Sequence, residues 1–535
     1  MIGGISKKAP YFLILAVALV GLLFAALVLS ASIAVIGFKL PDALWYGVVV
    51  LLIWVVLEGL GRLGEGRFMK YEPWILMAVF FLFYVVIMLL APEMGQRKMP
   101  YDSLRAQMSL EAGHIAFYRP LKFYYWVNYD LLLSIMGIVF SPKLIVGQIL
   151  NAICRAAVLY PVFRLGERIS GRRMARFATI ATALSPALTL YSTVLVGDFL
   201  SAMFFLYAIY FFAVKSDWER FSTNNLVLWL GTGLLLGLGT IFKTIAFLYF
   251  FAFMVFIAIM ILEKRKIRMA LLLLTSMCAI CLAYKVALGV RSDVFVAAKE
   301  ISKASEEPKR GALESFAGGV LYEMWLGLCV QTGGSYSRTR DRAFRSAPKN
   351  EKIAMVKNML LDNMKKYPEF FVYKFKRVWG TNDSPGSILW WYHASCQNNC
   401  YNARNENYCP TWLAPLLRAE HLLTSFLFFL GASGFVLAMY RRRRMDSWVI
   451  GVLSLAVVLS YAGMSMIIES HGRYRTSIYP FFFMIIPFAG VWFEKDNPVY
   501  VRICRLVRKV RGRKCTDVGI ADENVQETDE KQPVS

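Results

Sequence analysis

The sequence predicts an all-α polytopic membrane protein with about twelve transmembrane helices. Hydrophobic residues make up 57% of the chain and the mean hydropathy is +0.49, which is far outside the range of soluble proteins. The apolar residues also gather in runs of about 17 to 25, the length that crosses a bilayer as a helix. The predicted spans are 11–37, 43–60, 73–91, 144–164, 176–194, 198–214, 225–241, 243–262, 269–288, 422–440, 446–467 and 476–493.

The basic residues predict the orientation of the helices. The net charge of +24 lies mainly in segments between the apolar runs, which disfavours nucleic acid as a partner and is typical of cytoplasmic loops. Lys7 and Lys8 precede an apolar run too long for a cleavable signal peptide, so we expect a retained first helix with the N-terminus inside. This orientation places the basic segments on the cytoplasmic side: 62–70, 168–176, 264–268, 441–444 and 502–513.

The same orientation exports two long segments and defines the expected organisation. The first exported loop, 92–143, is expected to carry short juxtamembrane helices, and the second is expected to fold as a small cap because it is long and rich in aromatic residues. The expected divisions are 1–72 (a two-helix extension with a cytoplasmic loop), 73–288 (transmembrane core), 289–421 (cap), 422–493 (C-terminal helices) and 494–535 (a basic, then acidic, disordered tail).

Four cysteines fall in the second exported segment. Disulfides persist on an oxidising face, so we expect pairing among these four, with the connectivity open. They are Cys329, Cys396, Cys400 and Cys409. A zinc site is the weaker interpretation because no CxxC pair is present, and the four histidines show no ligand spacing either. The sequence therefore predicts neither a metal nor a cofactor.

Charges at the ends of predicted spans are candidates for function, because a charge is costly in hydrocarbon. Asp198 follows Gly197 at the outer end of one span, and Lys243 interrupts the apolar pattern at the outer end of another. The alternative is that both side chains only reach the interface, which suits a long lysine better than a short aspartate.

The first exported loop contains the aromatic-rich stretch KMPYDSLRAQMSLEAGHIAFYR. An amphipathic helix here would place Asp102, Arg105, Glu111 and His114 toward water or toward a site. An acid in this position suits a general base for a hydroxyl acceptor, and a solvated loop acid is the alternative.

The third outer segment, Glu469 to Arg475, leads into the last span. Its two guanidiniums, Arg473 and Arg475, flank Tyr474 and suit a phosphate, which arginine binds through paired donors. Anchoring to lipid headgroups is the alternative.

Several ordered stretches resemble the GT-C membrane glycosyltransferases of the protein O-mannosyltransferase and aminoarabinose-transferase type. GLGTIFKTIAFLYF is similar to a Gly-rich family helix that ends in a Lys-bearing pair, and ESHGRYRTSIYPFFFMIIPFAG resembles the family's segment before a late helix. LIVGQILNAICRAAVLYPVFRLGERISGRRMARFATIATALSPALTLYSTVLVGDFLSAMFF and KKYPEFFVYKFKRVWG also resemble family segments, so that the resemblance covers most of 73–493.

The resemblance implies inverting transfer of a sugar from a polyprenyl-phosphate-linked donor to a lipid, glycan or protein acceptor on the non-cytoplasmic face. The family pattern has an Asp-Glu pair early in the first exported loop, whereas this chain has Asp102-Ser103, with Glu93 as a rival for the base and Asp198 as a second acid. Lys243, Arg473 and Arg475 are expected at the donor phosphate. Further contacts to donor or acceptor are expected from Tyr101, Arg105, His114 and Tyr474.

Two other classes of protein fit part of the pattern. A lipid or glycan transporter or flippase also has many helices with charged ends, although no repeated half is seen and the charges lie at one end of the spans. An oligosaccharide polymerase or ligase would not use a single-sugar lipid donor. We expect the protein to lie in a bacterial inner membrane, in contact with membrane lipids. Both termini are expected to be cytoplasmic, and the active site is expected on the periplasmic or extracellular face.

Overall fold

All regular elements in the part of the chain described by the computed structural model are helices, as the sequence predicts. The chain divides into two units, Met1–Gly490 and Val491–Ser535. The elements described below lie in the first unit, except that the last one, η8, ends at Phe493. The described residues are 9–36, 40–63, 67–90, 110–111, 127–191, 194–215, 222–242, 246–262, 321–332, 334, 338–380, 413–441, 447–468, 475 and 478–494.

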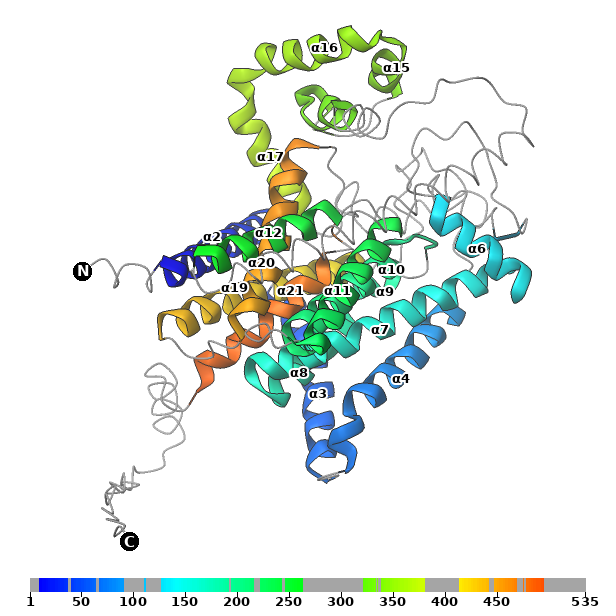
Figure 1. Ribbon diagram of the computed structural model, residues 1–535, viewed down its shortest axis with the longest axis vertical. Coiled ribbons are helices and arrows are strands. Elements are labelled where there is room, and N and C mark those ends of the chain that lie inside the picture. Colours follow the sequence, from blue (N-terminus) through cyan, green and yellow to red (C-terminus); the bar gives the residue numbers. More distant parts are fainter. Residues whose placement is uncertain are drawn as a thin grey trace. The chain divides into compact units, whose positions relative to one another are not determined.

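The apolar helices follow most of the predicted spans (Figure 1). They are α2 (Ala9–Ile36), α3 (Leu40–Leu63), α4 (Arg67–Leu90), α6 (Val127–Val139), α7 (Leu144–Ser170), α8 (Arg172–Leu184), α9 (Pro186–Tyr191), α10 (Asp198–Tyr210), η2 (Phe211–Lys215), α11 (Thr223–Phe242), α12 (Ala246–Leu262), α19 (Leu413–Tyr440), α20 (Trp448–Ile467), α21 (Tyr479–Ile485) and η8 (Ile486–Phe493). Six helical segments in the described residues are long and apolar enough to cross a membrane. The chain is an integral membrane protein.

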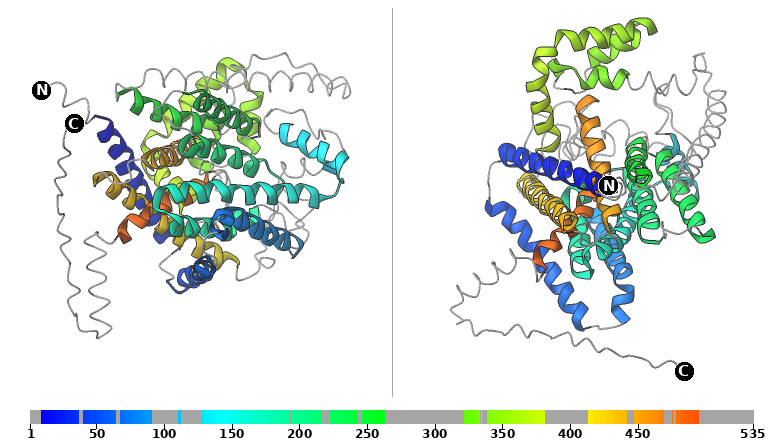
Figure 2. Two further views of the ribbon diagram at one scale, coloured as in Figure 1. Left: turned by 60° about the horizontal axis from the view of Figure 1, so that its bottom comes forward. Right: turned by 60° about the vertical axis from the view of Figure 1, so that its left-hand side comes forward.

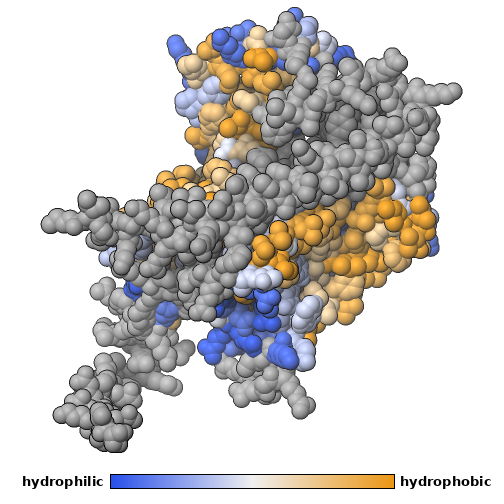
Figure 3. Space-filling view, in the orientation of Figure 1, coloured by the Kyte–Doolittle hydropathy of each residue, from blue (hydrophilic) through white to orange (hydrophobic). Residues whose placement is uncertain are grey.

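Helix α4 illustrates how these helices are built for lipid. Its buried residues recur every four positions, so they form one stripe of the helix. They are Leu76, Phe80, Tyr84 and Met88. Its exposed residues are equally apolar, and water would make such a surface costly. They are Val79, Leu82, Val86 and Leu89. Figure 3 shows this apolar surface in orange over α4 and α7.

The structure differs from the predicted elements in two places. The predicted span 176–194 is interrupted between α8 and α9 at Ser185, because Pro186 cannot donate the next helical hydrogen bond. Helix α19 begins at Leu413, inside the predicted cap. Helix α6 lies within 92–143, where the sequence predicts short helices. The predicted span 269–288 lies outside the described residues.

Glycines let two of the C-terminal helices approach closely. A Cβ at Gly431 of α19 would lie 2.4 Å from the Ile485 carbonyl oxygen, and one at Gly434 would lie 2.1 Å from that of Phe488. Only glycine fits at such distances. Helix α19 also packs along α2 and α3, and α7 packs along α8, α4 and α10 (Figure 2).

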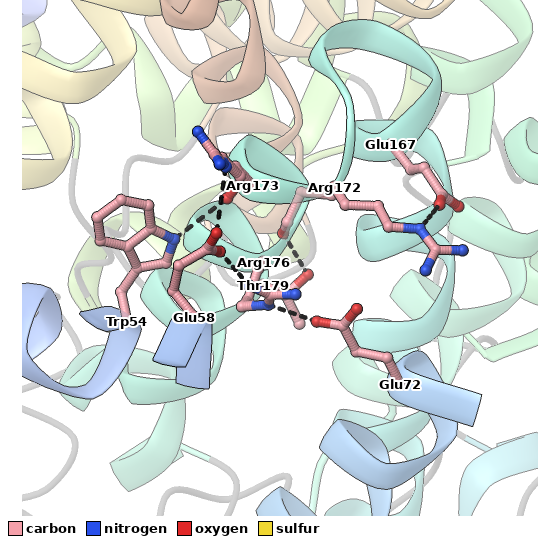
Figure 4. Close-up of polar contacts among 9 residues, drawn as sticks. Trp54, Glu58, Glu72, Glu167, Arg172, Arg173, Arg176 and Thr179 are labelled. Carbon is pink, nitrogen blue, oxygen red and sulfur yellow. Dashed lines mark hydrogen bonds and ion pairs between the residues drawn. The ribbon is translucent and has the colours of Figure 1, made fainter. Parts of the chain in front are cut away.

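An ion network joins three helix ends that the sequence assigns to the cytoplasmic side (Figure 4). The Arg176 guanidinium of α8 donates to Glu72 of α4 and to Glu58 of α3. Arg173 reaches Glu58 at 3.1 Å, and its side chain is 70% exposed whereas that of Arg176 is 6% exposed. These pairs hold the α3, α4 and α8 ends together.

The segment that the sequence assigns to the exported cap, 289–421, contains helices among its described residues, as predicted. A helical stretch at 321–327 precedes η3 (Val330–Thr332), α15 (Arg338–Ser346), α16 (Lys349–Asp362), η4 (Met364–Lys366) and α17 (Tyr367–Trp379). Its apolar core includes Trp325, Phe344 and Met359, and the Arg340 guanidinium lies 3.9 Å from the centre of the Trp325 ring. We call residues 321–380 the cap.

Candidate functional site

A buried polar cluster lies around Glu420 near the start of α19. The Glu420 Oε1 atom accepts hydrogen bonds from the hydroxyls of Ser185 at 2.8 Å, Tyr479 at 3.0 Å and Thr424 at 3.3 Å. These hydroxyls come from the α8–α9 break, from α21 and from α19 itself. A buried carboxylate needs such donors, since its desolvation is costly. The cluster therefore joins three parts of the chain through one acid.

Arg475 lies beside this cluster, just before α21. Its side chain is 1% exposed, and its guanidinium carbon lies 5.9 Å from the centre of the Trp379 ring of α17. Burial lowers the pKa of Arg475 below its ordinary value, and the nearby Tyr479, Tyr461 and Glu420 oppose that shift. Arg475, which the sequence predicts as a phosphate ligand, is thus a buried cation close to an acid and two phenols.

Arg155 lies on the other side of the α8–α9 break. Its Nη2 atom donates to the carbonyl oxygens of Thr182 at 3.1 Å and Ala183 at 3.2 Å, and to the Thr189 hydroxyl at 3.2 Å. The guanidinium also lies 4.7 Å from the centre of the Tyr84 ring. Carbonyls at a helix end lack helical partners, so Arg155 supplies donors where the proline interrupts the helix. Glu420 acts electrostatically on Arg155 as well as on Arg475.

His421, the next residue after Glu420, connects the cluster to α2 and to the cap. Its Nε2 atom lies 2.9 Å from the Trp379 carbonyl oxygen and 3.1 Å from the Ser32 hydroxyl. The sequence predicts this histidine at the end of the second exported segment, and in the structure it lies within α19, which begins at Leu413.

Asp198 is buried at the first position of α10. The residue before it, Gly197, packs against α11: a Cβ there would lie 3.0 Å from the Phe242 carbonyl oxygen. Phe242 directly precedes Lys243 in the sequence. The chain positions next to Asp198 and Lys243 are therefore in contact, although Lys243 itself lies outside the described residues.

Asn151 of α7 fixes the backbone close to Asp198. Its side chain donates to the Val194 carbonyl oxygen at 2.8 Å and accepts from the Tyr129 hydroxyl at 3.1 Å. Asp198 acts electrostatically on Tyr129. Helices α6 and α7 thus hold the chain that leads into α10.

The remaining predicted site residues come from the two exported loops, the segment before α21 and position 243. They lie outside the described residues: Glu93, Tyr101, Asp102, Arg105, His114, Lys243, Arg473, Tyr474, Cys396, Cys400 and Cys409. Cys329 is a buried free thiol in the cap core. Among the described residues, no three His, Cys, Asp or Glu side chains are close enough to hold a metal ion together.

Sequence reasoning missed Glu420 and Arg155 for different reasons. The charged stretch LLRAEHLL lowers the local hydropathy, so the predicted helix starts only at 422 and Glu420 falls in the predicted loop. Arg155 lies inside the predicted span 144–164, and a charge within a span was a signal that could have been followed. The partners of neither residue can be read from the sequence.

Solved structures of an oligosaccharyltransferase from Archaeoglobus fulgidus are similar to much of the chain. The archaeal oligosaccharyltransferase AglB, in complex with an inhibitory peptide and a dolichol-phosphate, is 14% identical, with 84% of this chain and 53% of that chain covered and a TM-score of 0.40. A structure tethered with an acceptor peptide containing the NVT sequon is 14% identical, with 85% and 53% covered and a TM-score of 0.38. The chain spans about half the length of these proteins.

No curated protein matches the chain. A family model described as dolichyl-phosphate-mannose-protein mannosyltransferase matches residues 128–287. This stretch contains Arg155, Ser185 and Asp198, whereas Glu420 and Arg475 lie beyond it. The resemblance to GT-C glycosyltransferases predicted from the sequence is therefore confirmed: residues 128–287 of this membrane protein are similar to the dolichyl-phosphate-mannose-protein mannosyltransferases.

Proposed function

We propose that the protein is a membrane glycosyltransferase that moves a sugar from a polyprenyl-phosphate-linked donor to a lipid, glycan or protein acceptor on the non-cytoplasmic face. The name of the matching family supports this proposal, because it specifies a sugar on a polyprenyl-type phosphate. The observation that carries the proposal is the buried Arg475 guanidinium beside Trp379 and the Glu420 cluster.

The charges of this cluster suit an anionic donor. Among the described residues, the Glu420 carboxylate acts on two buried guanidiniums, those of Arg155 and Arg475. A buried positive charge is stabilised by an anion, and arginine matches phosphate geometry through paired donors. We therefore assign Arg475 to the donor phosphate, together with Lys243 and Arg473 as expected from the sequence.

The proposed reaction is a single displacement with inversion. The acceptor hydroxyl loses its proton to Asp102, or to Glu93, as its oxygen attacks the anomeric carbon. The bond from that carbon to the phosphate oxygen breaks, and polyprenyl phosphate leaves with the electron pair. Arg475 stabilises the negative charge that develops on the leaving oxygen. Asp198 orients the acceptor.

A turnover assay tests this function. The purified protein in lipid nanodiscs is given single-sugar polyprenyl phosphates and a membrane extract as the acceptor source, and free polyprenyl phosphate is measured. We expect its release to depend on the protein and to persist in a chelator, since the sequence predicts no metal. Movement of the donor between leaflets of proteoliposomes without release would instead support a flippase. The base is identified by comparing Asp102→Asn with Glu93→Gln, because the variant that lacks the base should lose transfer activity.

A further inference from the structure

Lys374 of cap helix α17 is a buried charge with no role in the proposed reaction. Its side chain is 0% exposed. The ammonium donates to three carbonyl oxygens: that of Gly327 at 2.6 Å, Met466 at 2.9 Å and Ile468 at 2.6 Å. A lysine ammonium has three N–H donors, so it can donate to all three of these carbonyls.

The three carbonyls come from the ends of two separate helical segments. Gly327 ends the helical stretch 321–327 of the cap, whereas Met466 and Ile468 lie at the C-terminal end of α20. Carbonyls at such ends lack helical partners and carry partial negative charge, so a cation stabilises both ends at once. Lys374 therefore joins the cap to the end of α20.

The backbone around Lys374 leaves room for this arrangement. Gly334 has a φ of +74°, and a Cβ there would lie 3.1 Å from the Lys374 Cε atom and 2.8 Å from the Gly327 carbonyl oxygen. A larger residue at this position would be strained and would press on the lysine.

Helix α17 also contacts Arg475, the residue at the end of segment 469–475 and just before α21. Trp379, at the last position of α17, places its ring 5.9 Å from the Arg475 guanidinium, and its carbonyl oxygen lies 2.9 Å from His421 Nε2. Ile468 and Arg475 are the described residues on the two sides of 469–474. Helix α17 thus contacts the chain on both sides of this segment, through Lys374 and through Trp379.

We propose that Lys374 is a positioning residue for the donor phosphate: by fixing α17 on the end of α20, it holds Trp379 against Arg475. This inference rests on the proposed function of Arg475. Lys374 acts on the reaction through Arg475, because its own donors are directed to carbonyl oxygens. Its loss should therefore weaken donor binding more than it slows the chemical step.

The test compares Lys374→Met with Lys376→Met, a matched change on the exposed side of the same helix. We expect Lys374→Met to raise the KM for the lipid-linked donor by about tenfold, since misplaced binding groups cost affinity, and to change kcat less. Lys376→Met should leave both constants unchanged. A loss of folded protein alone would lower kcat per total protein and leave KM as it was, and that pattern would overturn the proposal.

Hydrogen–deuterium exchange gives a measurement that does not depend on turnover. Amides at the end of α20, including Ile468, whose N–H donates to Met464, should exchange at least several-fold faster in Lys374→Met than in Lys376→Met. Unchanged exchange overturns the joining role of Lys374 even if the wild-type protein transfers no sugar. Faster exchange in a protein without turnover would mean that the proposed function, and not the joining role, is wrong.

A second variant, Lys374→Arg, tests the proposal if Lys374→Met does not accumulate as folded protein. Lys374→Arg keeps the charge, but its planar fork cannot direct three donors as the ammonium does. We expect a rise in KM of about threefold, smaller than that of the methionine variant, with wild-type kcat. A wild-type KM in Lys374→Arg would overturn the proposal.

Discussion

Two buried arginines, Arg176 and Arg475, show how differently this protein treats a charge. Arg176 at the predicted cytoplasmic end contacts two carboxylates, those of Glu58 and Glu72. Arg475 at the predicted exported end lies beside an indole ring, two phenols and one carboxylate, and that carboxylate also acts on Arg155. The first site is balanced by its own acids and joins helices. Among the described residues, the second site combines two guanidiniums with one carboxylate, which suits an anionic ligand.

The largest effect on stability should come from Arg176→Met. Removing this guanidinium leaves Glu58 and Glu72 without their shared cation, which costs about 3–5 kcal/mol for a buried pair. Thermal unfolding followed by fluorescence-detected gel filtration measures the loss. Arg173→Met is the control, because its exposed contact with Glu58 is expected to contribute only about 0–1 kcal/mol. Equal losses in the two variants would contradict the structural role of Arg176.

The next effect, on activity, should come from Arg475→Met. We expect turnover of the lipid-linked donor to fall about 10²–10³-fold, the usual cost of removing a group that stabilises developing charge. Folded Arg176→Met should keep its activity per molecule. If Arg475→Met turned over normally, the cluster around Glu420 would not be the donor site.

Glu420→Gln tests the charge balance of the same cluster. Three hydroxyls lose a charged acceptor, so the variant should be destabilised by about 1.5–3 kcal/mol. Because positive charge then increases, polyprenyl phosphate should raise the melting temperature of this variant more than that of the wild type. A smaller rise in the variant would speak against phosphate binding here.

The smallest effect is expected for Tyr479→Phe, which removes one hydroxyl from Glu420. The loss should be about 0.5–1.5 kcal/mol of stability, the net value of one hydrogen bond. Tyr440→Phe at the exposed end of α19 provides the control and should unfold like the wild type. If Tyr479→Phe lost more stability than Glu420→Gln, Tyr479 would have a role beyond its hydrogen bond to Glu420.

The sequence predicted the helices well because an apolar run of fixed length is a local property. It predicted the buried charges poorly. A charge within a helix lowers the hydropathy, so the charged stretch around Glu420 made the predicted helix begin at 422, whereas α19 begins at Leu413. Its hydrogen-bond partner Ser185 is 235 residues away, and the partners of Lys374 at the end of α20 are more than 90 residues away. No pattern along the chain reveals such pairs, since they depend on the packing of distant helices.

The glycine contacts between α19 and the helix that follows Arg475 limit how the protein can respond to a ligand. Gly431 packs against the Ile485 carbonyl oxygen of α21, and Gly434 packs against the Phe488 carbonyl oxygen of η8. Such close packing leaves α19 little space to slide past this segment, so Glu420 and Tyr479 keep their spacing. We therefore expect this part of the site to be preorganised, and any rearrangement during turnover to be carried by other segments of the chain. An alanine in place of Gly431 or Gly434 would push the two backbones apart and so would test whether this part of the site must be rigid.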